Sequence, residues 1–407
     1  MKSQFLSICA SVLLATFLAC GRSSRTIRIG ALAPLTGEAA GFGASTRNGY
    51  QLAVQEWNAR GGVLGRPLEL MLRDDQGSPA EGLGALTRLL EQDRVSALLG
   101  ASLSKVSYVT APILQSLGIP MISPTSSDPQ LTAVGDHIYR ICCTDQAQGG
   151  SAAAFAYRDL RARRAACIYD SASVYPAELA QAFQSRFTSL GGRMVAFLPH
   201  PAGSITMAAQ ITRLVRARPD VLYLPDLCAE AALLAQEARA QGFKGALMGG
   251  DGWDAPALAH SRGLESGFFT GNFSQDEDRP VVQEFVRNYR KRHGQDPDAC
   301  AALAYDSGSV LFDAIRRAGT ASGPALNAAL AASDYPGVTG QIRFDPQRNP
   351  AKPPLIIEIK SGRRFYRGKP AIESGPETPC NLPALGDDGG RQEKPLRNAT
   401  NISNLRH

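Results

Sequence analysis

The chain of 407 residues is 44% hydrophobic and 20% charged, which is typical of a globular protein long enough for two domains. Its net charge of +6 is the difference between 43 basic and 37 acidic residues. The basic residues are scattered apart from short groups such as 161–164 and 290–292, so the chain lacks the one-sided basic surface that a nucleic-acid partner requires.

The N-terminus has the pattern of a secretory signal. An apolar run over residues 5–19 follows Lys2 and ends just before Cys20, and it is too short for a membrane span. The preceding "FLAC" resembles the lipobox of bacterial lipoproteins, although Phe17 stands where leucine is usual. We therefore predict a signal peptide over 1–19 and lipidation of Cys20, which would anchor the chain to a membrane. An ordinary signal peptide with a chance cysteine is the alternative.

From Thr26 onward, short apolar strands alternate with amphipathic helices. The first unit is predicted to have strands at "TIRIGALAP", "RPLELMLRD", "VSALLG" and "IPMIS", and helices over 43–59, 79–92 and 104–117. This alternation predicts an α/β fold with a parallel sheet that helices cover on both faces.

The same alternation then repeats. The second unit is predicted to have strands at "AACIY", "RMVAFLP", "DVLYLP" and "ALMGG", and helices over 175–189, 207–217 and 229–241. Helices over 279–292 and 299–317 and the strand-like stretches "GQIRFD" and "LIIEIKSGRRFYR" follow. Residues 373–407 lack periodicity and are rich in Pro, Gly, Asn and charge, so we predict a disordered tail there.

Hydroxyl groups follow two strands of the first unit. Ligands of open parallel sheets bind beyond the carboxyl ends of the strands. There, "ASLSK" brings Ser102 and Ser104 to the start of a helix, and "PTSSDP" places Ser127 just before another. Backbone N–H groups at helix starts, joined by hydroxyls, suit an anion such as a carboxylate. Plain helix N-caps are the alternative for Ser104 and Ser127.

A carboxylate and aromatic rings follow strands of the second unit. "YDSASVY" supplies Tyr175, and "GGDGW" supplies Asp251 and Trp253. Gly-Asp-Gly is also common in turns, so a plain turn is the alternative for Asp251. A carboxylate beside aromatics suits a cation. A free amino acid carries both a carboxylate and an ammonium, so the two sets of strand ends together predict an amino-acid site.

The sequence resembles a known family from about Thr26 to Arg367. The chain is similar to the solute-binding lipoproteins of ABC importers in the branched-chain amino-acid-binding group. The stretches that carry the resemblance are "IGALAPLTGEAAGFGASTRNGYQLAVQEWNARGGVLGRPLEL", "DDQGSP", "LLGASLSKVSYVTAPIL", "GIPMISPTSSDPQLT", "YDSASVY", "QEARAQGF" and "MGGDGWDAP". Together they are specific for the family, although most are weak singly.

The resemblance implies the type I periplasmic binding protein fold, in which two Rossmann-like lobes are joined by a hinge that the chain crosses three times. The crossings would lie near Thr144, Gly271 and Pro336. The implied lobe boundaries are 26–144 plus 272–336 for lobe 1 and 145–271 plus 337–368 for lobe 2.

The resemblance also implies roles for individual residues. Ser104 and Ser127 would bind the ligand carboxylate, and Thr125 would offer its carbonyl to the ammonium. Asp251 would pair with that ammonium. All four match positions of the family's ligand site.

Aromatic residues are expected to complete the site. Phe42, expected in a glycine-rich loop before a helix, and Tyr175 would close over the ligand. Trp253 either touches the ligand or packs beneath its loop. Leu227 stands where many relatives have a tyrosine or another polar contact, so the ligand side chain stays open and the neighbouring Asp226 is an alternative contact.

The implied function is to capture a small amino acid and deliver it to an ABC permease. A branched-chain amino acid is the first choice of ligand. We expect a monomer in the periplasm or at the cell surface. A regulatory or sensory lipoprotein of the same fold, or one that binds amides or organic acids, is the alternative.

The chain has no GxSxG elbow and no phosphate-binding GxxxxGK[ST], so we do not expect it to be an enzyme. It also lacks CxxC pairs and ligand-spaced histidines, so we expect neither a metal nor another cofactor.

Overall fold

A computed structural model describes residues 26–201, 207–254, 258 and 260–368. The predicted signal peptide, Cys20 and the predicted tail lie outside these residues. Within them, no helix combines the length and the apolar character needed to cross a bilayer.

The first sheet has five parallel strands in the order β2-β1-β3-β4-β5. The strands are β1 (Ile27–Ala33), β2 (Leu68–Asp74), β3 (Leu98–Leu99), β4 (Met121–Ser123) and β5 (Ile138–Arg140). The helices that accompany this sheet are α2 (Ala40–Ala59), α3 (Pro79–Glu91), α4 (Ser104–Leu117), α10 (Pro280–His293), α11 (Ala299–Ala318) and α12 (Pro324–Ala331). We call this unit lobe 1.

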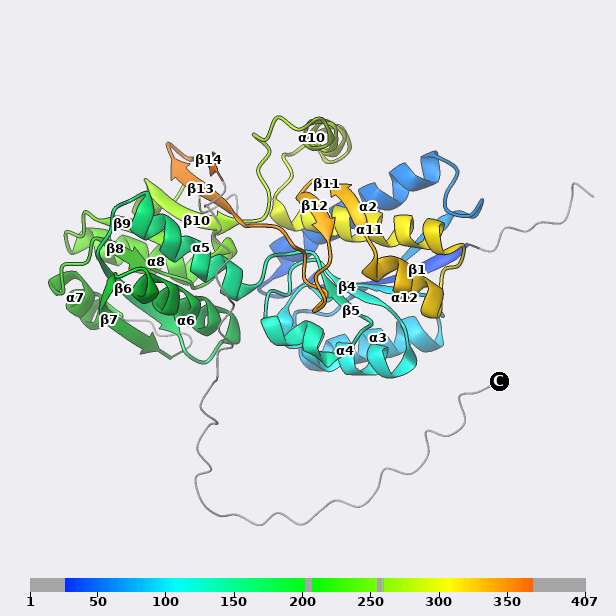
Figure 1. Cartoon of the computed structure of the whole chain (residues 1–407), viewed down its shortest axis with the longest axis horizontal. Helices are drawn as coiled ribbons and strands as arrows, with labels where there is room; N and C mark the ends of the chain where they lie inside the picture. Colours follow the sequence, from blue (N-terminus) through cyan, green and yellow to red (C-terminus); the bar gives the residue numbers. More distant parts are fainter. Residues whose placement is uncertain (1–25, 202–206, 255–257, 259, 369–407) are drawn as a thin grey trace, which may run out of the picture. The chain divides into compact units, whose positions relative to one another are not determined.

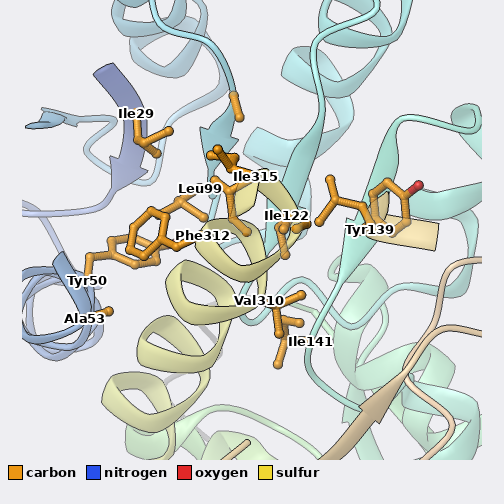
Figure 2. Packing of buried hydrophobic residues seen from close by; sticks show 14 of the residues in the cluster. Ile29, Tyr50, Ala53, Leu99, Ile122, Tyr139, Ile141, Val310, Phe312 and Ile315 are labelled. Carbon is orange, nitrogen blue, oxygen red and sulfur yellow. The ribbon is translucent and has the colours of Figure 1, made fainter. Parts of the chain in front are cut away.

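The core of lobe 1 joins segments that are far apart in the sequence. Figure 2 shows Phe312 and Ile315 of α11 packed beside Leu99 of β3 and Tyr50 of α2, and all four side chains are fully buried. The late helix α11 therefore completes a core that the first residues of the chain begin. Such burial of large apolar side chains contributes roughly 1.5–3 kcal/mol each.

The second sheet has seven strands in the order β14-β13-β10-β9-β8-β6-β7. They are β6 (Arg164–Asp170), β7 (Arg193–His200), β8 (Val221–Tyr223), β9 (Ala246–Gly249), β10 (Gly267–Gly271), β13 (Leu355–Lys360) and β14 (Arg363–Gly368). Figure 1 shows the late strand β13 running beside β10, with which it pairs antiparallel. The helices of this unit are α5 (Asp145–Arg158), α6 (Val174–Ser189), α7 (Ala208–Arg216) and α8 (Cys228–Ala240). We call it lobe 2.

The chain passes between the lobes at three places. The first crossing joins β5 to α5, and the second follows Gly271 at the end of β10. The third comes later than the expected position near Pro336. The hairpin of β11 (Asp334–Gly337) and β12 (Gly340–Arg343) stays with lobe 1, because Ile342 is buried in its core.

Hydrogen bonds explain why this hairpin belongs to lobe 1. The carboxylate of Asp306, on α11, accepts from the N–H groups of Val338 and Thr339 at 2.9 and 2.8 Å. The N–H of Ala351 still donates to the Arg343 carbonyl, and only then does the chain reach β13. The Asp306 carboxylate therefore ties the loop of this hairpin to α11.

Candidate functional site

The hydroxyl groups of lobe 1 lie at the carboxyl ends of β3 and β4. Ser104 is the first residue of α4, and no side chain caps the first turn of this helix. In the loop after β4, the Thr125 hydroxyl donates to the Ser102 carbonyl at 2.6 Å. Ser127, in the same loop, is 3% exposed. Uncapped helix N–H groups beside hydroxyls are suited to an anion.

The loop that holds Ser127 is tied to the start of α5. The Ser127 carbonyl accepts a hydrogen bond from the N–H of Asp145 at 3.1 Å. Asp145 is fully buried, and neither carboxylate oxygen makes a well-aligned hydrogen bond. Burial raises the pKa of Asp145 well above its ordinary value, and the nearby Ser127 hydroxyl opposes this. The first crossing therefore places a buried acid, Asp145, beside the candidate anion site.

Asp251 begins the short 3₁₀-helix η2 (Asp251–Trp253), directly after β9. Its Oδ1 accepts from the Tyr175 hydroxyl at 2.8 Å, and its Oδ2 accepts from Nδ2 of Asn272 at 2.9 Å. Its own N–H donates to Oε1 of Gln148 at 3.1 Å. Burial raises the pKa of Asp251 to about 6, while these hydrogen-bonding side chains act to lower it. The carboxylate is thus held in place and ionised at neutral pH.

Tyr175, in the first turn of α6, is oriented by two hydrogen bonds. Its hydroxyl accepts from the N–H of Gly252 at 2.7 Å, so its own proton is directed to Asp251. Leu227 lies against the same corner and is 43% exposed. A Cβ on Gly252 would come within 3.0 Å of both the Tyr175 hydroxyl and a methyl group of Leu227. Glycine at 252 therefore permits this close approach.

Asp226, considered as an alternative ligand contact, is committed to the protein. Its Oδ1 accepts from the N–H of Asp170 at 2.8 Å, and its Oδ2 meets Nε2 of His200 at 2.9 Å. Both members of the Asp226–His200 pair are about 2% exposed. This buried pair leaves Leu227, an apolar residue, as the exposed side chain at this place.

Phe42 lies in the first turn of α2, not in a loop before it, because the helix begins at Ala40. Its side chain lines a cavity of about 1010 Å³, to whose wall lobe 2 contributes Asp254 and Arg364. The described wall of this cavity includes none of the residues predicted to bind the charged groups of the ligand. Phe42 therefore borders a hollow with charged residues in its wall, and its closure over a ligand stays a prediction.

Trp253 is buried beneath its loop, where its side chain does not reach a ligand beside Asp251. The side chain is fully buried in the core of lobe 2, and its indole N–H donates to the Leu224 carbonyl at 3.0 Å. Of the two roles considered for Trp253, contact with the ligand or packing beneath its loop, this geometry fits the second. The residue supports the loop that carries Asp251 from beneath.

Three residues at this site were missed from the sequence. Asp145 and Gln148 belong to α5, a helix that was not predicted, and Asn272 follows β10, a strand that was not predicted. A signal for α5 exists, because Thr144 caps the helix by accepting from the N–H of Ala147 at 3.1 Å. The strand-end rule would also have found Asn272 once β10 was recognised.

Comparison with known proteins agrees with this geometry. Residues 26–363 match the family model described as "Periplasmic binding protein". "Leu/Ile/Val-binding protein homolog 2" of Brucella abortus is 29% identical over 364 residues, which cover 88% of this chain and 95% of the relative. Among solved structures, a leucine-binding protein from Thermotoga maritima is 30% identical with a TM-score of 0.78, covering 84% of this chain and 98% of that one.

A second solved structure shows the same fold with a ligand. It is a branched-chain amino acid transporter substrate-binding protein from Streptococcus pneumoniae in complex with isoleucine. It is 28% identical with a TM-score of 0.78, and the match covers 84% of this chain and 98% of that one. The expected type I fold is thereby confirmed, with a parallel sheet in lobe 1 and, in lobe 2, a parallel sheet to which β13 and β14 add an antiparallel edge.

Proposed function

Because this chain belongs to the family of periplasmic binding proteins, we propose that it captures an amino acid between its lobes and delivers it to an ABC permease. The observation that carries the proposal is the Asp251 carboxylate, which Tyr175 and Asn272 hold at the end of a strand. Relatives named for binding leucine, isoleucine and valine make a branched-chain amino acid the first candidate.

The two charged groups of the ligand would bind at different places. We assign its carboxylate to the start of α4 and to the hydroxyls of Ser104 and Ser127. We assign its ammonium to Asp251, with the Thr125 carbonyl as a second acceptor. Hydrogen bonds to charged groups are worth roughly 1.5–3 kcal/mol each, so a few of them suffice for micromolar binding, about −8 kcal/mol.

The ligand side chain would meet Leu227. This leucine is 43% exposed beside Tyr175, and it presents a methyl-rich surface at lobe 2. Burying an apolar ligand side chain against it contributes roughly 25 cal/mol per Å² of apolar surface. An apolar contact here favours leucine, isoleucine or valine over ligands with polar side chains.

Closure follows from contacts that both lobes share. A ligand held by lobe 1 alone leaves Asp251 without its cation. Only the closed form makes the carboxylate contacts at lobe 1 and the ammonium contact at lobe 2 together. The ligand therefore shifts an existing equilibrium between open and closed forms. Within this proposal, Cys20 carries a lipid that keeps the monomeric receptor at the membrane beside its permease.

A thermal-shift screen of the purified mature chain tests the proposal. L-amino acids, amides and carboxylic acids are compared on the wild type and on Asp251→Asn, with Asp93→Asn as a matched control in lobe 1, where Asp93 pairs with Arg73. We expect branched-chain amino acids to raise the melting temperature with concentration, in the wild type and the control only. A shift kept in Asp251→Asn would contradict the ammonium role. No shift with any compound, in protein freed of carried-over ligand, would favour the regulatory alternative.

A further inference from the structure

Asn272 begins the second crossing, directly after β10, and its side chain is only 3% exposed. Its Oδ1 accepts a hydrogen bond from the N–H of Cys143, in the first crossing, at 2.9 Å. Its Nδ2 donates to Oδ2 of Asp251 at 2.9 Å. One amide group therefore connects two hinge crossings with the candidate ammonium-binding carboxylate.

The orientation of this amide follows from its partners. The N–H of Cys143 can only donate, so it faces the amide oxygen of Asn272. An ionised carboxylate can only accept, so Asp251 faces the amide nitrogen. The opposite flip would lose both hydrogen bonds. The N–H of Cys143 thus fixes the orientation of Asn272, and this orientation presents a donor to Asp251, which favours its ionised form.

The two ends of Asp251 are held by different residues. Gln148 holds its backbone, since Oε1 of Gln148 accepts from the N–H of Asp251 and from the Thr270 hydroxyl. Asn272 and Tyr175 hold its carboxylate, one at each oxygen. A carboxylate has about four acceptor sites, so roughly two remain for a ligand ammonium. Loss of the Asn272 amide would therefore free one carboxylate oxygen, while Tyr175 still holds the other and Gln148 still holds the backbone.

We propose that Asn272 is a positioning residue that holds Asp251 charged and oriented for the ligand and ties this carboxylate to the hinge. Binding at Asp251 and closure of the lobes are then coupled through one side chain. The ligand-facing part of this inference rests on the proposed function. The effect of Asn272 on Asp251 itself does not, and it can be measured in the ligand-free protein.

Several titratable groups surround Asp251, and each is a possible influence on its charge. They come from α5, α6, β8, the first crossing and the loop after η2, and they are Asp145, Tyr175, Tyr223, Cys142, Cys143 and Asp254. All are acids. The ionised form of Asp251 is favoured instead by hydrogen-bonding side chains, and the Asn272 amide joins Tyr175 and Gln148 in this.

The first experiment measures the pKa of Asp251 by NMR in full-length mature protein with ¹³C-labelled aspartate, without ligand. Asp251→Asn identifies the signal. We expect the pKa to rise from wild type to Asn272→Ala, which removes the donor, and to rise further in Asn272→Asp, which adds a like charge. Asn272→Asp retains an acceptor for Cys143, so it separates the Asp251 contact from the hinge contact.

Asn288 offers a matched control. Its Nδ2 donates to Oε1 of Glu56 at 2.8 Å within lobe 1. Asn288→Ala and Asn288→Asp therefore make the same changes beside another acid. If the pKa of Asp251 is unchanged in both Asn272 variants, or moves equally in the Asn288 variants, the positioning role is wrong.

The second experiment measures leucine affinity by calorimetry at several pH values. We expect Asn272→Ala to bind leucine on the order of tenfold more weakly at neutral pH, and its affinity to decline at a higher pH than in the wild type. An unchanged pH profile would contradict the inference. Wild-type protein that binds no amino acid would contradict the proposed function instead, and the NMR measurement would still decide the role of Asn272.

Discussion

The two charged ends of the candidate site are built in different ways. The lobe 1 end consists of the start of α4 and nearby hydroxyls, which are neutral groups close together in sequence and near a helix terminus. The lobe 2 end is a single carboxylate, and the residues that hold it, Tyr175, Gln148 and Asn272, come from three distant segments. In the proposed site, anion binding would thus rest on local backbone geometry, whereas cation binding would depend on the tertiary structure.

The two ends also differ in the free energy that each costs when no ligand is bound. Backbone N–H groups and hydroxyls lose little when the site is empty, because water can replace the ligand. A partly buried carboxylate is less favourable when empty, because burial raises the pKa of Asp251 to about 6. The lobe 2 end should therefore respond to pH and contribute to instability, whereas the hydroxyl and N–H groups that would bind the anion at the lobe 1 end do not themselves titrate.

The largest expected effect is on pH dependence. In the proposed function the ligand ammonium binds ionised Asp251, whose pKa of about 6 lies well above that of an ordinary aspartate. Affinity should be full above this pKa and fall about tenfold between pH 7 and pH 5 as the carboxylate is protonated. Calorimetry with leucine measures it. Asp251→Asn should bind weakly without this pH dependence, and a flat wild-type profile would contradict the assignment.

A smaller loss is expected at lobe 1. Ser104→Ala or Ser127→Ala removes one hydroxyl while the backbone N–H groups remain, so each should weaken leucine binding about three- to tenfold. The pH profile should keep the wild-type midpoint, because neither hydroxyl titrates. Calorimetry over the same pH series checks both points. A shifted midpoint in Ser104→Ala would show that the two ends are not separate.

The smallest effect is on stability. The folded pKa of Asp251 is raised, so ionised Asp251 opposes folding above its unfolded pKa of about 4, and this cost grows as the pH rises through the folded pKa of about 6 and is complete above about pH 7. This rise in pKa corresponds to roughly 3 kcal/mol, but an amide at 251 also places an NH₂ group against one of the two donors, Tyr175 and Asn272. Asp251→Asn should therefore recover only part of this and raise the free energy of unfolding of the empty protein by about 1 kcal/mol at pH 7.5. Urea unfolding measures this gain, which should disappear near pH 4. Destabilisation at pH 7.5 would mean that its hydrogen bonds outweigh the burial.

Much of lobe 1 was predictable, because its signals are local. The predicted helix over 104–117 has the same bounds as α4, and it ends at Gly118 in the left-handed conformation that glycine favours. The helix expected from 43 begins three residues earlier, at Ala40, since the glycines of "AAGFGAS" do not interrupt it.

The elements that were missed have weak local signals. β5 has three residues, and α5 contains the pair Gly149–Gly150, which in a sequence favours a break. The structure gives a tertiary reason for the first glycine. A Cβ on Gly149 would lie 2.6 Å from the Leu179 carbonyl, so glycine lets α5 pack closely against α6. Asn272 was missed for a related reason, since its contact with Asp251 exists only after both strands have paired.

Leu227 shows how such a receptor can diversify. It precedes α8, is 43% exposed, and is not among the buried residues of the lobe 2 core. The neighbouring Asp226–His200 pair keeps its own hydrogen bonds whatever stands at 227. Within the proposed function, a single codon change there would alter which side chain is accepted while the charged ends and the folded lobe are inherited intact. Gene duplication followed by drift at this one position would then be a short route to a new nutrient.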